Sequence, residues 1–251
     1  GMFQVTLWYD EMPELFAEKY IEAPTDGWAI PLPTYREFEM DRVPGDGKRD
    51  TLYITTMQPE GDYNEVYVSL NGNEVFLENC EGYRITPNLV CMNDSGILKY
   101  FLYVETTVES DYRTMYIYDL NGDKPELCAE LSGVGYAGKY VESAESNIWF
   151  ESVFHNPPEI YFDTTIQMLG TWSGCKTYRV NPKDGVPMAM TDYYTITESE
   201  RPLVLKRELE VLALPQQTKE TLPAGTKLYL KRTDGKTYAE LELEDGRECR
   251  I

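Results

Sequence analysis

A single histidine limits the catalytic chemistry that this chain could perform. A serine or cysteine nucleophile that relies on an imidazole base would have to use His155, because the chain has no other histidine. His155 directly precedes Asn156-Pro157-Pro158, which predicts a loop, and the sequence has no Gly-x-Ser-x-Gly turn. We therefore interpret His155 as incidental and assign no catalytic residue.

A pair of carboxylates acting on a glycosidic bond is the alternative chemistry. With 43 Asp and Glu residues, the composition does not single out one pair. Glu37 and Glu39 alternate ahead of Asp41 and should share one face of a strand, where they would solvate an acidic sheet edge. The run Gly45-Asp46-Gly47 lacks the later glycine of a dinucleotide-binding motif and precedes a strand pattern, so we expect no nucleotide site.

One acidic loop invites a comparison with calcium sites. Residues 45–52, Gly-Asp-Gly-Lys-Arg-Asp-Thr-Leu, resemble the end of the Asp-rich calcium loop of integrin-type repeats. That loop should begin Asp-x-Asp or Asp-x-Asn, whereas this chain has Arg42 and Pro44 at those positions. Two oxygen ligands are therefore missing from the roughly six to eight that calcium takes. Asp46 and Asp50 remain the metal candidates, but we expect an Asp-Gly turn before a strand and no cofactor.

Aromatic residues gather around a long segment near residues 155–174, which is a candidate binding surface. They are Trp149, Tyr161, Phe162 and Trp172. Side chains of this kind could form a platform for sugar rings or peptide side chains, since stacking and apolar burial would offset the ordering of a ligand. The competing interpretation places Trp149 and Phe162 in the core, and it is favoured because large aromatic side chains are mostly buried.

The charge excludes two classes of partner and divides the chain. The 43 acidic residues against 23 basic ones would repel nucleic-acid phosphates and anionic membrane surfaces, so we expect neither partner. No apolar run approaches the roughly 18 residues of a membrane-spanning helix, and the start of the chain lacks the pattern of a leader. Residues 201–251 hold ten basic and nine acidic side chains, which leaves thirteen and thirty-four for residues 1–200. This shift in composition predicts a domain boundary near Arg201-Pro202.

The cysteines give no metal or redox motif. The chain has five of them, and none forms a Cys-x-x-Cys pair, which argues against zinc and thioredoxin-like sites. Buried free thiols are the expectation. One bridge, from Cys80 to Cys91 or to Cys128, is the alternative that the sequence leaves open.

A repeat of about fifty residues organises the first two hundred. Residues 52–56 match residues 102–106, and residues 66–72 match residues 116–122, both at an offset of 50. Each unit predicts a strand, a loop, a second strand, an Asn-Gly turn of type I′ and a third strand. A fainter third copy spans residues 148–154 and 177–185 and ends in Asp184-Gly185. Such units should stack as the blades of a propeller do, in an array of four or five or an incomplete one, with a β-sandwich as the alternative.

The last fifty residues predict a different unit. Four short strands with alternating apolar residues are joined in part by Asp234-Gly235 and Asp245-Gly246, two hairpin signals, and closure into a small barrel would remove the exposed edges. The run from Leu222 to Leu228, with residues 233–238 and 245–248, resembles a bacterial Src-homology-three-like barrel. Such modules lie at the ends of secreted and envelope proteins, and some bind cell-wall peptides.

These patterns together predict a mostly β protein. Residues 2–201 would form a propeller-like repeat domain, five-bladed or incomplete, similar to the repeats of extracellular Gram-positive proteins, because residues 177–185 resemble their tyrosine-rich strand before a turn. Residues 202–251 would form the small barrel. The expected function is a non-enzymatic extracellular or cell-envelope binding module for a carbohydrate or a cell-wall peptide, with no insertion into the membrane. The alternative is a glycan-active hydrolase that uses two carboxylates.

Overall fold

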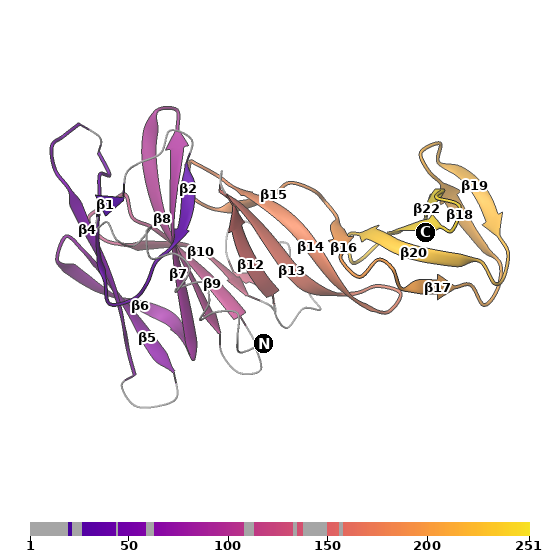
Figure 1. The fold of residues 1–251 in the computed structure, drawn as a ribbon, viewed down its shortest axis with the longest axis horizontal. Helices are drawn as coiled ribbons and strands as arrows, with labels where there is room; N and C mark the ends of the chain where they lie inside the picture. Colours follow the sequence, from indigo (N-terminus) through magenta and orange to yellow (C-terminus); the bar gives the residue numbers. More distant parts are fainter. Residues whose placement is uncertain are drawn as a thin grey trace.

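A computed structural model describes most of the chain as strands. It describes residues 20–21, 27–43, 45–58, 63–107, 113–132, 135–137, 150–155 and 158–251. The regular secondary structure within these ranges consists of β-strands, with no helix. The molecule is elongated, with three sheets following one another along its length (Figure 1). The prediction of a mostly β protein is therefore confirmed.

Sheet A lies at one end of the molecule and contains the first repeat unit. Its strands run in the order β1-β3-β4-β5-β6, and all neighbours are antiparallel except β1 and β3. Their bounds are β1 (Tyr20–Ile21), β3 (Glu37–Met40), β4 (Asp50–Met57), β5 (Asn64–Leu70) and β6 (Asn73–Gly82).

Sheet B lies in the middle and contains the second repeat unit. Its order is β11-β10-β9-β8-β7-β2, with antiparallel pairing throughout. The bounds are β2 (Trp28–Pro31), β7 (Arg84–Asp94), β8 (Ile97–Thr107), β9 (Arg113–Asp119), β10 (Glu126–Ser132) and β11 (Gly135–Ala137).

Sheet C carries the third unit and continues into the C-terminal residues. Its main path is β12-β13-β14-β16-β20-β21-β22-β18-β19, while β15 pairs with β14 and β17 with β20. The bounds are β12 (Phe150–His155), β13 (Glu159–Gln167), β14 (Thr171–Val180), β15 (Pro187–Ala189), β16 (Tyr194–Ile196), β17 (Pro202–Val204), β18 (Leu209–Ala213), β19 (Thr218–Leu222), β20 (Lys227–Thr233), β21 (Ala239–Leu243) and β22 (Glu248–Arg250). His155 is thus the last residue of a strand and not part of a loop, so that expectation was wrong.

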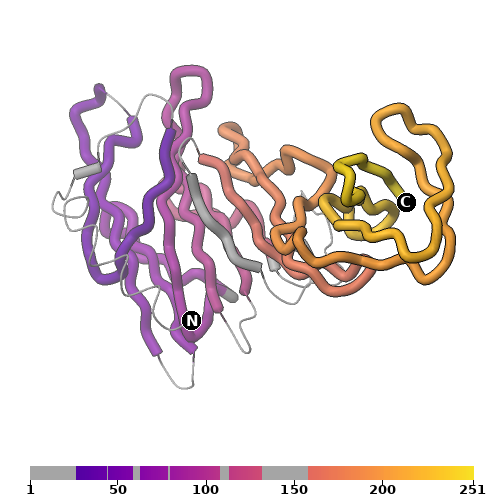
Figure 2. Tube along the Cα trace, turned by 45° about the vertical axis from the view of Figure 1, so that its right-hand side comes forward, coloured from indigo at the N-terminus to yellow at the C-terminus, as the bar shows by residue number. Residues whose placement is uncertain are grey.

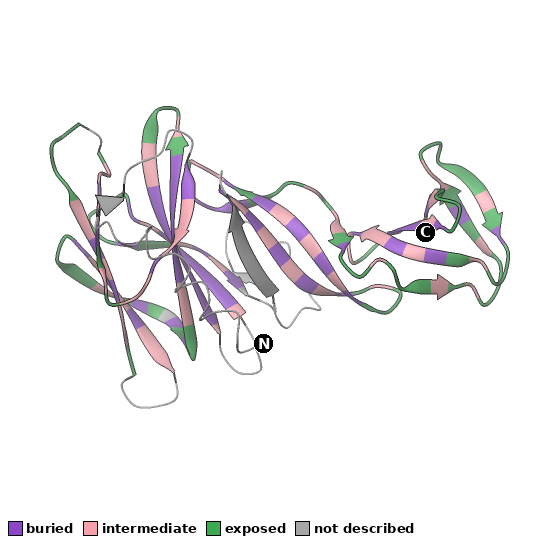
Figure 3. Cartoon of the chain, viewed as in Figure 1, coloured by how far each residue is buried: buried purple, intermediate pink, exposed green. Residues whose placement is uncertain are grey.

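The central sheet is buried on both faces. Along β8, Tyr100, Leu102 and Val104 enter a core shared with sheet A. The alternate residues Phe101 and Tyr103 enter a second core shared with sheet C. Because both faces of β8 meet apolar neighbours, its sequence lacks the polar alternation of a half-exposed strand. By contrast, β13 and β14 alternate between buried and partly exposed residues (Figure 3).

The fifty-residue repeat is structural, although its register differs between the units. Both copies form antiparallel strand pairs, β4 with β5 and β8 with β9. Ile54 lies opposite Val68, whereas Val104 lies opposite Tyr116, two residues before the position that the offset of 50 predicts. A shift by two residues keeps every side chain on its face, so both units still present the same face to their shared core.

The two Asn-Gly turns differ in conformation. Asn71 and Gly72 have φ values of 53° and 79°, as a type I′ turn requires, and they join β5 to β6 directly. Neither Asn121 nor Gly122 is in the left-handed region, and the connection from β9 to β10 runs through residues 120–125. The prediction of a type I′ turn is therefore confirmed at the first unit and wrong at the second, where Pro125 and a longer loop replace it.

The turn of the third unit docks onto sheet B. Gly185 has a φ of 71°, and a Cβ at this residue would lie 2.3 Å from the ring of Phe101. The hydroxyl of Tyr103 donates to the carbonyl of Gly185, and Lys99 Nζ donates to the carbonyl of Lys183 at 2.9 Å. Glycine is needed here both for its backbone conformation and for this close approach.

The C-terminal strands belong to sheet C and share one core with Ile166, Trp172 and Ile196 of its preceding strands. Both Asp-Gly signals are confirmed as antiparallel connections, β20 to β21 and β21 to β22. The chain curls at this end of the molecule (Figure 2), but no sheet closes on itself in the described part. β16 pairs with both β14 and β20, and Trp172 packs in the same core as Val211 and Leu222. Pairing and packing thus continue across residue 201, while the boundary there remains a prediction.

All five cysteines are free thiols in the structure. Cys80 and Cys91 contribute to the core between sheets A and B without forming a bridge. Burial raises the pKa of Cys91 to about 11 and that of Cys128 to about 12, so both thiols stay protonated at neutral pH. The fold is built without a disulfide among these residues.

Replacing Gly185 with alanine should destabilise the protein more than replacing Gly72. Both glycines have a left-handed backbone, which costs a residue with a Cβ about 1–2 kcal/mol. Only Gly185 faces a buried ring, and overpacking there should add about 1–3 kcal/mol. Urea unfolding of the two variants measures the difference, and equal losses of stability would contradict the docking of this turn onto Phe101.

Limited proteolysis tests the predicted boundary. Residues 198–202 and 216–220 are mostly exposed, and we expect the first cuts there because exposed turns are accessible to proteases. A stable fragment that ends near residue 201 would support a separate C-terminal domain. Resistance at residues 198–202 would instead indicate that the shared sheet and core hold the two parts together.

Candidate functional site

The aromatic residues predicted to form a platform do not come together. Phe162 packs in the core between sheets B and C, where its ring meets Tyr178 edge-on at a centroid distance of 4.9 Å. Trp172 is 2% exposed in the C-terminal core, with the guanidinium of Arg201 3.8 Å from the ring centroid. Tyr161 is half-buried on the other face of β13, and Trp149 lies outside the described residues. Phe162 and Trp172 are therefore core residues of two different clusters.

The loop that resembles a calcium site is organised by protein groups. Asp46 Oδ1 accepts the backbone N–H of Lys48 at 2.7 Å, which gives the Asp-Gly turn expected before β4. Asp50 Oδ1 accepts Arg42 Nη2 at 2.7 Å and Asn71 Nδ2 at 2.5 Å. Within the described residues, no group of three or more His, Cys, Asp or Glu side chains could hold a metal ion. Asp46 binds the backbone of Lys48, whereas Asp50 binds Arg42, so the two carboxylates have different partners. The guanidinium of Arg42 takes the place beside Asp50 that a metal ion would need.

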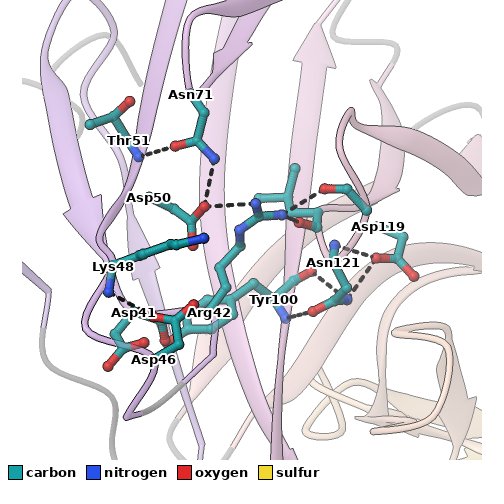
Figure 4. Close-up of polar contacts among 12 residues, drawn as sticks. Asp41, Arg42, Asp46, Lys48, Asp50, Thr51, Asn71, Tyr100, Asp119 and Asn121 are labelled. Carbon is teal, nitrogen blue, oxygen red and sulfur yellow. Dashed lines mark hydrogen bonds and ion pairs between the residues drawn. The ribbon is translucent and has the colours of Figure 1, made fainter.

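Arg42 is the centre of a polar cluster between sheets A and B (Figure 4). Its Nη2 binds Asp50, while Nη1 donates to the carbonyl of Leu120 and, at 2.7 Å, to that of Gly122. The side chains of Arg42 and Asp50 are only 13% and 18% exposed. The hydrogen bond from Arg42 lowers the pKa of Asp50 below its usual value, although burial opposes the shift. Because the charges of Arg42 and Asp50 are paired with each other, the cluster is suited to holding the two sheets together.

The asparagines of the two repeat turns have equivalent roles. Asn71 Oδ1 accepts the backbone N–H of Thr51 at 2.8 Å, and Asn121 Oδ1 accepts that of Tyr100 at 2.9 Å (Figure 4). Each side chain thereby joins the turn after one strand to the backbone of the neighbouring strand. The matching Asn-Gly pairs are visible in the sequence as turn signals. The hydrogen bonds of the asparagine side chains could not be predicted from them, because a turn motif does not show which neighbouring strand supplies the backbone N–H.

The outer face of sheet A is the surface best suited to a ligand. It includes side chains that point away from the core, none of which is buried: Glu37, Glu39, Thr51, Tyr53, Thr55, Met57, Glu65, Tyr67, Ser69, Glu74 and Phe76. Tyr67 and Phe76 are direct cross-strand partners with ring centroids 5.2 Å apart. Tyr53 is a diagonal neighbour of Tyr67, a position within reach of a large side chain.

Carboxylates lie beside these rings. The hydroxyl of Tyr67 donates to Glu65 Oε2 at 3.0 Å. This hydrogen bond, followed by burial and by the charges of Glu65 and Glu74, raises the pKa of Tyr67. The phenol therefore stays protonated and remains a donor at neutral pH. The expectation that Glu37 and Glu39 share one face of a strand is confirmed. The aromatic part of this face was not predicted, because period-two alternation marks a half-exposed strand without saying which sheet ends the stack.

No protein-family model, curated protein or solved structure matches this chain. A search of the described residues finds no helix of the length and apolarity needed to cross a membrane.

Replacing Arg42 with methionine should lower the free energy of unfolding by about 2–4 kcal/mol. The substitution keeps much of the side-chain volume, but it leaves Asp50 with Asn71 as its remaining side-chain donor and takes the Arg42 donor from the carbonyls of Leu120 and Gly122. Arg49→Met is the matched control, because the ion pair of Arg49 with Glu39 is exposed and should contribute about 0–1 kcal/mol. Chemical denaturation compares the two variants, and equal stabilities would show that the Arg42 cluster does not hold the sheets together.

Proposed function

We propose that this protein is a non-enzymatic binding module of the extracellular space or the cell envelope. Its ligand would be a glycan or a cell-wall peptide, bound on the outer face of sheet A. The observation that carries the proposal is the open row of Tyr53, Tyr67 and Phe76 on this face. Aromatic rings with one wet edge favour ligands that have both apolar and polar surfaces.

The size of the aromatic row suits a small extended ligand. The three rings come from adjacent strands, which lie about 4.8 Å apart, and Tyr53 lies one row away from Tyr67 and Phe76, so the group spans about 12 Å along its diagonal. Hydroxyl groups lie beside the rings, because Thr55 pairs with Tyr67 and Ser69 pairs with Tyr53. A short oligosaccharide or peptide could therefore stack on the rings and form hydrogen bonds at their edges.

We also propose that the stacked sheets are propeller-like units and that residues 202–251 are a domain of the Src-homology-three-like kind. The first idea is supported by the fifty-residue repeat and by the position of sheet B between two other sheets. Sheets A and B meet through equivalent faces, which favours the β-sandwich alternative for that pair. The second idea is supported by the two Asp-Gly hairpins and by the core that most of these strands share, although that core also takes in Trp172 and Ile196 from the preceding strands. The resemblance of this segment to envelope modules is the reason for the proposed location.

The double substitution Tyr67→Ala and Phe76→Ala should reduce binding at least tenfold, with little loss of stability. Both side chains lie on an open face, so their removal takes contacts from a ligand and few from the core. Sedimentation with purified peptidoglycan sacculi, and titration with soluble fragments of a sacculus digest, measure binding. Circular dichroism monitors the melting temperature.

Two control variants separate the outer face from the platform predicted near β13. Tyr161→Ala should leave binding unchanged, since Tyr161 lies on sheet C. Trp172→Ala should lower the stability by about 3–5 kcal/mol because the ring is buried. Loss of binding in Tyr161→Ala would favour the predicted platform. Turnover of a chromogenic glycoside that disappears when one carboxylate is replaced would establish the hydrolase alternative instead.

A further inference from the structure

We propose that the outer face of sheet A selects a cationic partner, namely an extended peptide that carries free amino groups. This inference rests on the proposed function and narrows it, because it chooses the peptide over the neutral glycan. The juxtaposition that carries it is an aromatic pair, Tyr67 and Phe76, with a carboxylate on each side along the strand direction.

The register of β5 and β6 fixes that juxtaposition. Tyr67 faces Phe76 across the pair, and Glu74 faces Ser69 in the next row on the same face. Glu65 lies two residues before Tyr67, on the opposite side of the aromatic row, where it accepts the hydroxyl of Tyr67. Glu65 and Glu74 therefore flank the rings from opposite ends.

The charge of this face favours a cation over other ligands. Its side chains include Glu37, Glu39, Glu65 and Glu74 and no lysine or arginine, and the nearby Arg49 is paired with Glu39 at 3.0 Å. An ammonium group above Tyr67 and Phe76 would face the two rings, with the carboxylate of Glu65 on one side and that of Glu74 on the other. Cation–π attraction adds about 0.5–1 kcal/mol at an exposed site, which a neutral sugar would not gain.

The same charges argue against a second copy of the chain as the occupant. A two-fold contact through this face would bring the carboxylates of one molecule against those of the other. The chain as a whole has a net charge of −20, which also attracts basic peptides over long distances. Charge complementarity thus points to a basic partner rather than to self-association.

The test compares three probes on the intact protein by fluorescence anisotropy. They are a short lysine-containing peptide, the same peptide with glutamine in place of lysine, and a neutral chitin oligosaccharide. We expect the lysine peptide to bind at least tenfold more tightly than the other two. Its affinity should fall severalfold when the salt concentration rises from about 20 mM to about 300 mM, because salt screens exposed charges.

Substitutions then locate the contact. Glu65→Gln with Glu74→Gln should weaken binding of the lysine peptide at least tenfold. Glu210→Gln with Glu244→Gln removes the same number of charges from exposed ion pairs in the C-terminal part and should leave the affinity nearly unchanged. Equal losses in both variants would assign the effect to net charge and overturn the inference.

The outcomes separate this inference from the proposed function. If sacculi binding is lost in Tyr67→Ala with Phe76→Ala but kept in Glu65→Gln with Glu74→Gln, the outer face is a binding site and the cationic selectivity is wrong. Equal affinity for the lysine and glutamine peptides also overturns the selectivity. If none of the probes and no sacculi bind to the unmodified protein, both proposals fail.

Discussion

The burial of sheet B on both faces is the constraint on which the rest of the structure depends. Strand β8 sends Tyr100, Leu102 and Val104 into one core and Phe101 and Tyr103 into another, so an isolated sheet B would expose two apolar surfaces to water. Each square ångström of apolar surface removed from water is worth about 25 cal/mol, and sheets A and C each cover one of these surfaces. This requirement places sheet B between sheets A and C. The two outer sheets differ in what covers the face that points away from sheet B.

Polar contacts at the turns complete both interfaces. At the junction of sheets A and B, Arg42 reaches the carbonyls of Leu120 and Gly122 at the end of β9. At the junction of sheets B and C, the Tyr103 hydroxyl reaches the carbonyl of Gly185. In each case, a side chain from the preceding sheet holds the turn of the next unit. These directional contacts specify how the sheets meet, because apolar packing alone is not directional.

The two outer sheets of the stack differ in how they continue. Sheet C continues through β16 into the C-terminal strands, whose core includes Trp172. Sheet A ends the stack, so its outer face keeps Tyr53, Tyr67 and Phe76 at the surface. This difference explains why Tyr103 is fully buried while Tyr53, its equivalent in the first unit, is only half-buried. A ligand-binding surface on sheet A would thus arise from the same repeat that builds the core elsewhere.

The sequence by itself determined the local features of this protein: its strands, the Asn71-Gly72 turn and the Asp-Gly hairpins near the C-terminus. These follow from period-two alternation and from glycine at left-handed positions, which are properties of neighbouring residues. Only the tertiary structure decided that Phe162 and Trp172 are buried, that β9 pairs two residues away from the predicted register, and that Arg42 binds Asp50 beside a distant turn. Each of these depends on which sheet covers which face, and that arrangement is set by contacts between residues far apart in the chain, whose partners no local pattern identifies.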